Sequence, residues 1–199
     1  MEKTAETLYP IHDLLQRRWS PRAFSDRMVE PERLLSLWEA ARWAPSCFNE
    51  QPWSFIAATK EDPHEYSRLL SCLVEGNVAW ARHAPVLMIS VAKKHFDYDG
   101  SPNHHAWHDV GQAVTSLTMQ ATALGLAVHQ MAGILPDKIR ELYQVPDQYV
   151  PVAGIALGYP GNPESLPETL RKKELAPRVR RATNEFVFSG RWGQRSKLV

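Results

Sequence analysis

Apolar residues recur along the chain with the two periods that distinguish helices from strands. The strongest helical pattern follows position 109, where six apolar residues fall at i, i+3, i+4, i+7, i+11 and i+14 and so share one face. These residues are Val110, Ala113, Val114, Leu117, Ala121 and Leu124. Gly111, Ala123 and Gly125 would let another helix approach closely. The sequence therefore predicts either the central helix of an intimate dimer or an ordinary core helix.

Shorter apolar runs predict the strands, and prolines with capping residues predict the remaining helices. Strands are expected over residues 54–59, 86–91, 126–129 and 150–157. Helices are expected over residues 11–16, 31–43 and 136–143, and from Pro63 after its cap Asp62. Interleaved elements of this kind indicate an α+β sandwich, in which a mixed or antiparallel sheet of about four strands is flanked by helices. We expect residues 1–199 to form a single domain, since no repeat or linker interrupts them.

The composition is that of an ordinary soluble globular protein. Hydrophobic residues make up 44% of the 199 positions and charged residues 23%, and the formal net charge is +1. This balance argues against nucleic acid or an anionic membrane as a partner, and no apolar run is long enough to span a bilayer. The N-terminus lacks an apolar signal core, so we expect a cytoplasmic location. The two cysteines, Cys47 and Cys72, are expected to be free thiols.

A turn rich in arginine follows the first predicted helix. Residues 18–24 read RWSPRAF, which brings two guanidinium groups and a hydroxyl into one turn interrupted by Pro21. Arginine can donate two parallel hydrogen bonds to phosphate oxygens, so Arg18, Ser20 and Arg22 form a candidate phosphate clamp. The alternative for Arg22 is an ion pair with Asp26, four residues further on.

A second motif follows the predicted helix over residues 31–43. Residues 44–53 read APSCFNEQPW and place a hydroxyl and two side-chain amides on a loop between prolines. An amide both donates and accepts hydrogen bonds, so Asn49 and Gln51, together with Ser46, suit the edge of a flat heterocycle. Alternatively, Asn49 and Gln51 only hold the loop in shape. Cys47 has no histidine near it in the sequence, and we interpret it as a thiol that lines a pocket.

The two motifs, in this order, resemble those of the FMN-dependent nitroreductase family. The likeness covers nearly the whole chain and implies that family's fold, an intertwined homodimer with FMN at the subunit interface. It also implies that the loop after the third predicted strand, residues 130–133, presents backbone N–H groups to the flavin. The implied FMN-binding residues are Arg18, Trp19, Ser20, Arg22, Pro45, Ser46, Cys47, Asn49, Gln51, Gln130, Met131, Ala132, Gly133, Arg180 and Arg181. Whether Arg17 or Arg18, and Arg180 or Arg181, meets the phosphate stays open.

The C-terminal segment, residues 177–199, mixes arginines with large apolar residues. Phe186, Val187, Phe188 and Trp192 are apolar enough to require burial against another surface. In the family that the chain resembles, this segment reaches across to the other subunit. The resemblance therefore implies an extended C-terminal arm in a homodimer.

A polar stretch with several aromatic residues lies between positions 93 and 108 and shows no clear periodicity. It is a candidate mobile flap, and its residues Phe96, Tyr98, His105 and Trp107 are candidates for contact with substrate. His104, His105, His108 and Asp109 form the one group that resembles a metal site. The His-Glu-x-x-His pattern of catalytic zinc is missing, so we expect no metal.

The resemblance implies an FMN-dependent NAD(P)H oxidoreductase. Hydride would pass to flavin N5 and the electrons would then pass to a nitroaromatic, quinone or similar electron-poor small molecule, in a ping-pong sequence at one shared site. Three alternatives stay open. The protein could be a flavin carrier or redox sensor without turnover, a flavin enzyme of the same fold that does not use nicotinamide, or a zinc hydrolase built on the His104 group.

Overall fold

The computed structural model describes residues 3–199, which form a four-stranded sheet covered by helices on both faces. The strands are β1 (Trp53–Thr59), β2 (Val86–Lys93), β3 (Ala127–Met131) and β4 (Tyr149–Gly158). The α-helices are α1 (Asp13–Arg17), α2 (Pro31–Arg42), α3 (Pro63–Leu70), α4 (Glu75–Ala81), α5 (Ala106–Ala123), α6 (Pro136–Tyr143) and α7 (Glu168–Leu175). Short 3₁₀ helices are η1 (Cys47–Asn49), η2 (Pro163–Ser165) and η3 (Thr183–Glu185).

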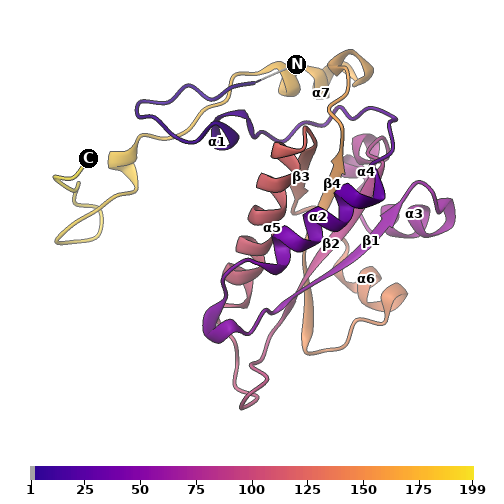
Figure 1. The fold of residues 1–199 in the computed structure, drawn as a ribbon, viewed down its shortest axis with the longest axis horizontal. Helices are drawn as coiled ribbons and strands as arrows, with labels where there is room; N and C mark the ends of the chain where they lie inside the picture. The colour runs from indigo at the N-terminus through magenta and orange to yellow at the C-terminus, as the bar shows by residue number, and fades with distance from the viewer. Residues whose placement is uncertain (1–2) are drawn as a thin grey trace.

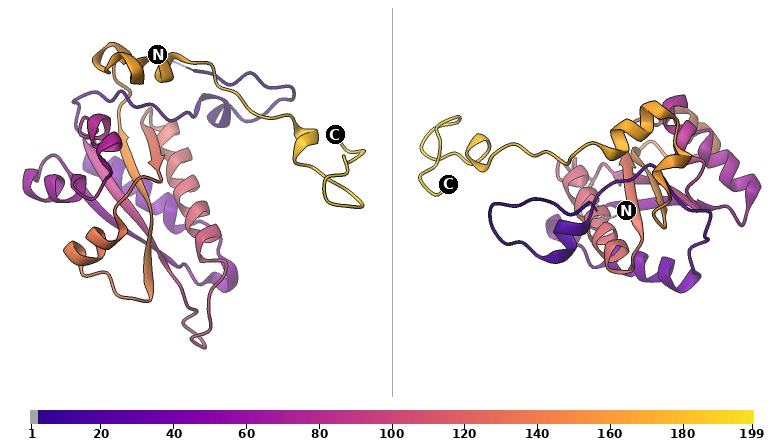
Figure 2. Two further views of the ribbon diagram at one scale, coloured as in Figure 1. Left: turned by 180° about the vertical axis from the view of Figure 1, so that it is seen from behind. Right: turned by 90° about the horizontal axis from the view of Figure 1, so that it is seen from above.

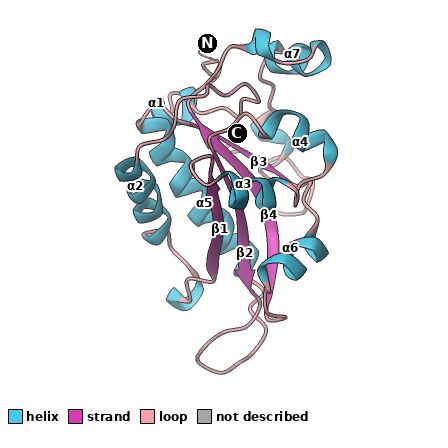
Figure 3. Cartoon of the chain, turned by 90° about the vertical axis from the view of Figure 1, so that its right-hand side faces the viewer, coloured by secondary structure: helices cyan, strands magenta, loops and turns pink. Residues whose placement is uncertain are grey.

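All neighbouring strands of the sheet are antiparallel, in the order β1-β2-β4-β3. Side chains of a strand point alternately to its two faces, so β2 contributes to two separate cores. Val86 and Met88 pack with α2 and α5, whereas Leu87 and Ile89 pack on the side of α3, α4 and α6 (Figure 3). The predicted α+β sandwich with about four strands is confirmed, and the sheet is purely antiparallel.

Helix α5 is the longest helix of the described chain, and five of the six residues that the periodicity predicts are buried in it, while Leu124 is half-buried just after its end. Val110, Ala113, Val114, Leu117 and Ala121 are at most 2% exposed and pack against the sheet. The opposite face of α5 is open, with Gly111 and Thr115 exposed to solvent.

Two details of the structure correct the sequence interpretation. Strand β3 runs on through Met131, so Gln130 and Met131 belong to the strand rather than to the loop after it. Helices α4 and α7 were not predicted. Helix α7 buries only one residue, Glu174, so it carries no apolar stripe that a periodicity could reveal.

The N-terminal segment and the C-terminal tail run close together near α7 and extend away from the body of the molecule (Figures 1 and 2). Hydrogen bonds connect them: Arg178 Nη1 donates to the carbonyls of Lys3 (2.6 Å) and Gln16 (2.7 Å). Both segments expose large apolar side chains, among them Leu8, Val179 and Trp192, the last at 94%. Surfaces of this kind usually mark a protein interface.

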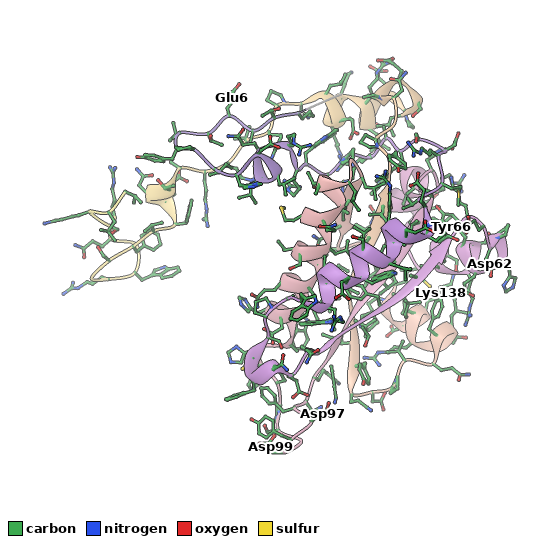
Figure 4. The ribbon with its side chains drawn as sticks, in the orientation of Figure 1. Glu6, Asp62, Tyr66, Asp97, Asp99 and Lys138 are labelled. Carbon is green, nitrogen blue, oxygen red and sulfur yellow. The ribbon has the colours of Figure 1, made fainter. Side chains whose placement is uncertain are left out.

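The stretch between β2 and α5 forms a loop that projects from the other end of the molecule. Figure 4 shows Asp97 and Asp99 at the tip of this loop, and Glu6 on the N-terminal segment toward the opposite end. Within residues 3–199, no helix is long and apolar enough to cross a membrane.

Candidate functional site

The backbone of the arginine turn, residues 18–23, is held by side chains and backbone groups from distant parts of the chain. Helix α1 ends at Arg17, since Arg18 already has a non-helical ψ of 123°, and Pro21 prevents a helix from resuming at Ser20. The carboxylate of Glu174 accepts hydrogen bonds from the N–H groups of Arg22 (2.9 and 3.0 Å) and Ala23 (3.1 Å). The turn lacks the regular backbone hydrogen bonds of a helix or a sheet, so these contacts satisfy its backbone N–H groups instead.

Two further contacts complete this frame. Nδ1 of His129, on β3, lies 2.8 Å from the carbonyl oxygen of Pro21. The N–H of Gly161 donates to the carbonyl of Ala23 (2.8 Å). A Cβ atom at Gly161 would lie 2.5 Å from the backbone of Phe24, so only glycine allows this close approach. Glu174 of α7, His129 of β3 and the backbone of Gly161 therefore all hold the turn in place.

Positively charged residues line a cavity of about 250 Å³ that Ser20 also lines. Its cationic lining residues are Lys3, Arg18, Arg22, Lys173, Arg178 and Arg180. The one acidic residue in the lining, Glu174, is already bonded to the backbone of the turn. Six cationic residues on the lining of one cavity suit an anion, and the planar guanidinium groups favour phosphate or carboxylate. We call this group of residues the anion cleft.

The arginines of the anion cleft influence one another. Burial lowers the pKa of the Arg18 guanidinium from its ordinary value, and the charges of Arg178 and Arg180 lower it further. Burial and the charge of Arg180 lower the pKa of Arg178 in the same way. Cations held this close together repel one another, so an anion bound between them would relieve the repulsion.

The geometry distinguishes the arginines that the sequence left as alternatives. Arg18 lines the anion cleft with Nη1 3.3 Å from Ser20 Oγ, whereas Arg17 pairs with Asp13 at 2.7 Å. Arg180 also lines the cleft, whereas the Arg181 guanidinium lies 5.2 Å from the centre of the Phe186 ring.

Arg22 and Trp19 also lie at the anion cleft. The nearest carboxylate to the Arg22 guanidinium is that of Glu174, at 4.0 Å, rather than Asp26, which lies 4.0 Å from Lys60. The alternative Arg22–Asp26 pair is therefore wrong. The ring of Trp19 packs below Lys3, whose Nζ is 5.0 Å from the ring centre.

The second motif forms a tight loop, residues 46–51, that is held mainly by its own backbone and by α5. Ser46 Oγ accepts a hydrogen bond from the Gln51 N–H (3.0 Å), and Gln51 Nε2 donates to the carbonyl of Asn49 (3.1 Å). The buried carboxylate of Asp109 accepts from the Cys47 N–H (3.0 Å). Gln51 thus takes part in shaping the loop, while the side chain of Asn49 is exposed.

Three residues of this loop adopt left-handed backbone conformations. The φ angles are 51° at Phe48, 58° at Asn49 and 51° at Gln51. Asparagine tolerates this region, but for a bulky residue such as Phe48 it is strained. Strain of this kind collects at functional sites, where the surrounding contacts impose it.

The two motifs lie at different ends of α5 within one chain (Figure 1). Loop 46–51 contacts Asp109 in the first turns of the helix. Arg18 and Ser20 line a second cavity, of about 210 Å³, together with Thr115, Thr118 and Met119 of the helix. Nine residues separate Asp109 from Thr118, which corresponds to about 14 Å along the axis.

Residues 130–133 are divided between two environments. Gln130 is exposed and lines the second cavity with Arg18 and Ser20, whereas Met131 is buried in the core. Ala132 is exposed, and a Cβ at Gly133 would lie 2.5 Å from Asn77 Nδ2 of α4. A side chain at position 133 would therefore crowd Val74 and Asn77 at the start of α4.

The predicted flap contacts the second motif rather than the arginine turn. The rings of Phe96 and Tyr98 both pack against Phe48, at 6.0 and 5.9 Å between centres. Phe96 is buried and anchors the loop, while Tyr98 is 63% exposed. His105 immediately precedes α5, and Trp107 lies in its first turn.

The open face at the start of α5 borders a shallow hollow of about 510 Å³. Trp107, His108 and Gly111 line it from the helix, and Pro45 lines it from the second motif. Among residues 3–199, no group of three or more histidine, cysteine or acidic side chains gathers as metal ligands would, and Asp109 is engaged with Cys47.

Sequence reasoning missed several residues of the anion cleft and its frame, among them Lys3, His129, Lys173, Glu174 and Arg178. Lys3 Nζ donates to the carbonyls of Glu174 (2.6 Å) and Ala176 (2.5 Å), so it joins the N-terminal segment to the end of α7. A single residue that lies far from the arginine turn in the sequence forms no local pattern that could reveal its contact with the turn. Only the density of arginine between positions 178 and 181 could have pointed to Arg178.

His129 is neutral in the folded protein. Burial lowers its pKa to about 4, and the charge of Arg22 adds to this effect although the carbonyl of Pro21 opposes it. Because that carbonyl can only accept, Nδ1 of the neutral ring carries the proton. The ring also packs on Trp80, at 4.5 Å between centres.

Comparison with known proteins agrees with this fold. A solved structure described as an oxidoreductase containing FMN superposes with a TM-score of 0.90, at 37% identity over 96% of each chain. An uncharacterised 15.4 kDa protein of Mycolicibacterium smegmatis is 32% identical over 64% of this chain and 84% of its own length. The FMN reductase (NADPH) of Bacillus subtilis is 27% identical over 76% of this chain and 66% of its own. The Nitroreductase family model matches residues 15–159, and the chain belongs to the nitroreductase family.

Proposed function

We propose that this protein is an FMN-dependent oxidoreductase that takes electrons from NAD(P)H and reduces nitroaromatic, quinone or similar electron-poor small molecules. The observation that carries the proposal is the anion cleft, whose lining brings six cationic residues together with Ser20. Family membership and the FMN-containing relative support the choice of cofactor. The NADPH-specific name of the Bacillus subtilis relative supports nicotinamide as the reductant.

The residues present fit the phosphate end of FMN. A phosphate monoester carries close to two negative charges at neutral pH, and Arg18, Arg22 and Arg180 supply charged donors on one cleft. Ser20 adds a hydroxyl donor beside Arg18.

The neighbouring cavity fits the uncharged part of the cofactor. It shares Arg18 and Ser20 with the anion cleft and offers the hydroxyl of Thr115 and the amide of Gln130 as hydrogen-bonding groups. Met119 and Val128 supply apolar walls. An amide with an adjoining apolar wall suits a flat heterocycle that has both polar edges and apolar faces.

Bound FMN would itself supply the redox chemistry, accepting a hydride from NAD(P)H and passing the electrons to the acceptor. The protein's own part is to hold the phosphate, orient the ring and limit access of water. The exposed ring of Tyr98 and the ring of Phe48 are placed to contact an aromatic acceptor from the loop side. Because donor and acceptor would use one face in turn, we expect ping-pong kinetics.

A homodimer with its cofactor sites at the interface is part of the proposal. The open face of α5, bordered by Trp107 and Pro45, offers a surface to a second copy. The exposed apolar residues of the two terminal segments, including Leu8, Val179 and Trp192, need a partner surface. In such a dimer, loop 46–51 of one subunit can approach the cofactor held by the other. The predicted arm over residues 177–199 fits this arrangement. The cytoplasmic location of the protein stays a prediction.

The proposal is tested by an absorbance spectrum of the purified protein, followed by anaerobic addition of NADPH and NADH. Flavin bands that bleach within seconds support an FMN enzyme reduced by nicotinamide. Flavin bands that persist favour a carrier or an enzyme with another reductant. A colourless protein that FMN does not reconstitute contradicts the proposal.

A further inference from the structure

Glu174 is a fully buried carboxylate at the edge of a site that is built for an anion. Its side chain is 1% exposed, and α7, to which it belongs, buries no other residue. Taking a carboxylate out of water costs several kcal/mol unless hydrogen bonds replace the water. A negative charge here also repels a bound anion, so neither solvation nor attraction of the ligand explains its presence.

The hydrogen bonds of Glu174 explain it better. Both carboxylate oxygens face the Arg22 N–H, at 2.9 and 3.0 Å, and one of them also accepts from the Ala23 N–H at 3.1 Å. The guanidinium of Arg22 lies 4.0 Å away. The carboxylate therefore fixes the N–H groups of two consecutive residues, Arg22 and Ala23, and also lies near the Arg22 guanidinium.

Helix α7 is in turn held in place at the anion cleft. Lys3 Nζ donates to the backbone carbonyls of Glu174 and Ala176 at the end of the helix. The residue that sets the turn is thus itself fixed by the N-terminal segment. Glu174 lies beyond residues 15–159, to which the family match is confined.

We infer that Glu174 is a positioning residue for the phosphate end of the cofactor site: it fixes the turn that directs Ser20 and Arg22 into the anion cleft. This inference rests on the proposed function. A turn fixed before the ligand arrives loses less conformational entropy on binding. Removing the carboxylate should therefore weaken recognition of the phosphate and leave recognition of the flavin ring unchanged.

The test compares FMN with riboflavin, which has the same ring system but no phosphate. Dissociation constants of both are measured for apoprotein by quenching of flavin fluorescence, and the ratio of riboflavin to FMN values reports on the phosphate alone. In Glu174→Gln we expect FMN to bind about tenfold more weakly, since a charged hydrogen-bond acceptor is lost, with riboflavin unchanged. The ratio should fall by the same factor.

Glu168→Gln is the matched control. Glu168 is also on α7, but its side chain is 67% exposed and pairs with Lys172, so its removal should leave both constants unchanged. The second variant is Arg22→Gln, alone and combined with Glu174→Gln. If Glu174 acts through the turn that carries Arg22, the double variant should lose less binding free energy for FMN than the sum of the losses in the two single variants.

Three outcomes would overturn the inference. Unchanged affinities for both flavins in Glu174→Gln would show that the carboxylate does not serve phosphate binding. A rise in FMN affinity would show that its charge acts mainly by repulsion. An equal loss for FMN and riboflavin, together with a lower unfolding temperature, would show a general structural role. The proposed function fails separately, if wild-type protein binds neither flavin.

Discussion

Two segments carry the proposed cofactor contacts, the arginine turn and, in the proposed dimer, loop 46–51 of the other subunit, and they obtain their shapes in opposite ways. Residues 18–23 depend on groups far away in the sequence: Glu174 lies 152 positions beyond Arg22, and His129 lies 108 positions beyond Pro21. Loop 46–51 depends mainly on itself, through the Ser46–Gln51 hydrogen bond and left-handed residues, with Asp109 as its support from α5.

The difference matches what each segment would recognise. A phosphate needs several charges in one place, and like charges assemble only where a frame from the rest of the fold holds them. The edge of a heterocycle needs a few correctly oriented neutral groups, which a short rigid loop can present. Loss of Arg22, which lines the anion cleft but not the neighbouring cavity, should therefore affect FMN alone, and damage to the second segment should affect FMN and riboflavin together.

Deleting residues 177–199 should have the largest effect. The deletion removes Arg178 and Arg180 from the anion cleft together with the exposed apolar residues of the tail. We expect loss of bound flavin and dissociation of the dimer, measured by absorbance and light scattering. A double variant, Arg178→Ala with Arg180→Ala, should lose flavin and stay dimeric. A truncated protein that remains a yellow dimer would refute both roles of the tail.

Arg22→Ala should weaken FMN binding about 100-fold, or ~2.7 kcal/mol, because a charged donor to the phosphate is lost. Riboflavin affinity should stay the same, since its ring does not use this guanidinium. Titration of apoprotein with each flavin measures both values. An unchanged FMN affinity in Arg22→Ala would contradict the role of Arg22 in binding the phosphate.

Acidification should destabilise the frame of the arginine turn. The pKa of His129 is about 4 in the folded protein and 6.5 ordinarily, so the unfolded chain takes up a proton first as the pH falls. Stability is complete above about pH 6.5 and falls between there and pH 4, by about 2 kcal/mol at pH 5. Urea unfolding at several pH values should show this loss. In His129→Gln, whose amide can still donate to the Pro21 carbonyl, the free energy of unfolding should fall by about 2 kcal/mol less than in the wild type when the pH is lowered to 5. An equal pH dependence of stability in the two proteins would contradict the lowered pKa of His129.

Asp109→Asn should have the smallest effect of the four and the opposite selectivity to Arg22→Ala. The variant keeps the size of the side chain but replaces the charged acceptor of the Cys47 N–H. We expect both flavins to bind about tenfold more weakly, because the loop that meets the ring is loosened. The ratio of the two dissociation constants should stay constant. A selective loss of FMN would remove the distinction between the two segments.

Much of the fold follows from the sequence. Periodicity located α5 and its buried residues, and Asp62 caps α3 by accepting from the Glu65 N–H, as the cap and proline predicted. Helix α7 could not be found in this way, because Glu174 is the only residue that it buries. Gly133 suggested close approach to a ligand, which stays a prediction; in the structure a Cβ at this position would crowd the side chains of Asn77 and Val74.

The site was predictable only in part, for the same physical reason. Local motifs indicated Arg18, Ser20 and Arg22, which lie together in the anion cleft. Lys3 and Glu174 act through long-range contacts, which leave no pattern in neighbouring residues. The sequence also could not show that the two motifs lie at different ends of α5, since that depends on how α2 and the sheet are arranged.

The most direct test of the central claim is a pair of titrations of wild-type apoprotein, one with FMN and one with riboflavin, at low and at physiological salt. The anion cleft predicts that FMN binds at least about 100-fold more tightly and that the difference narrows as salt rises. Equal affinities at both salt concentrations would contradict the claim that these six cations form a phosphate site.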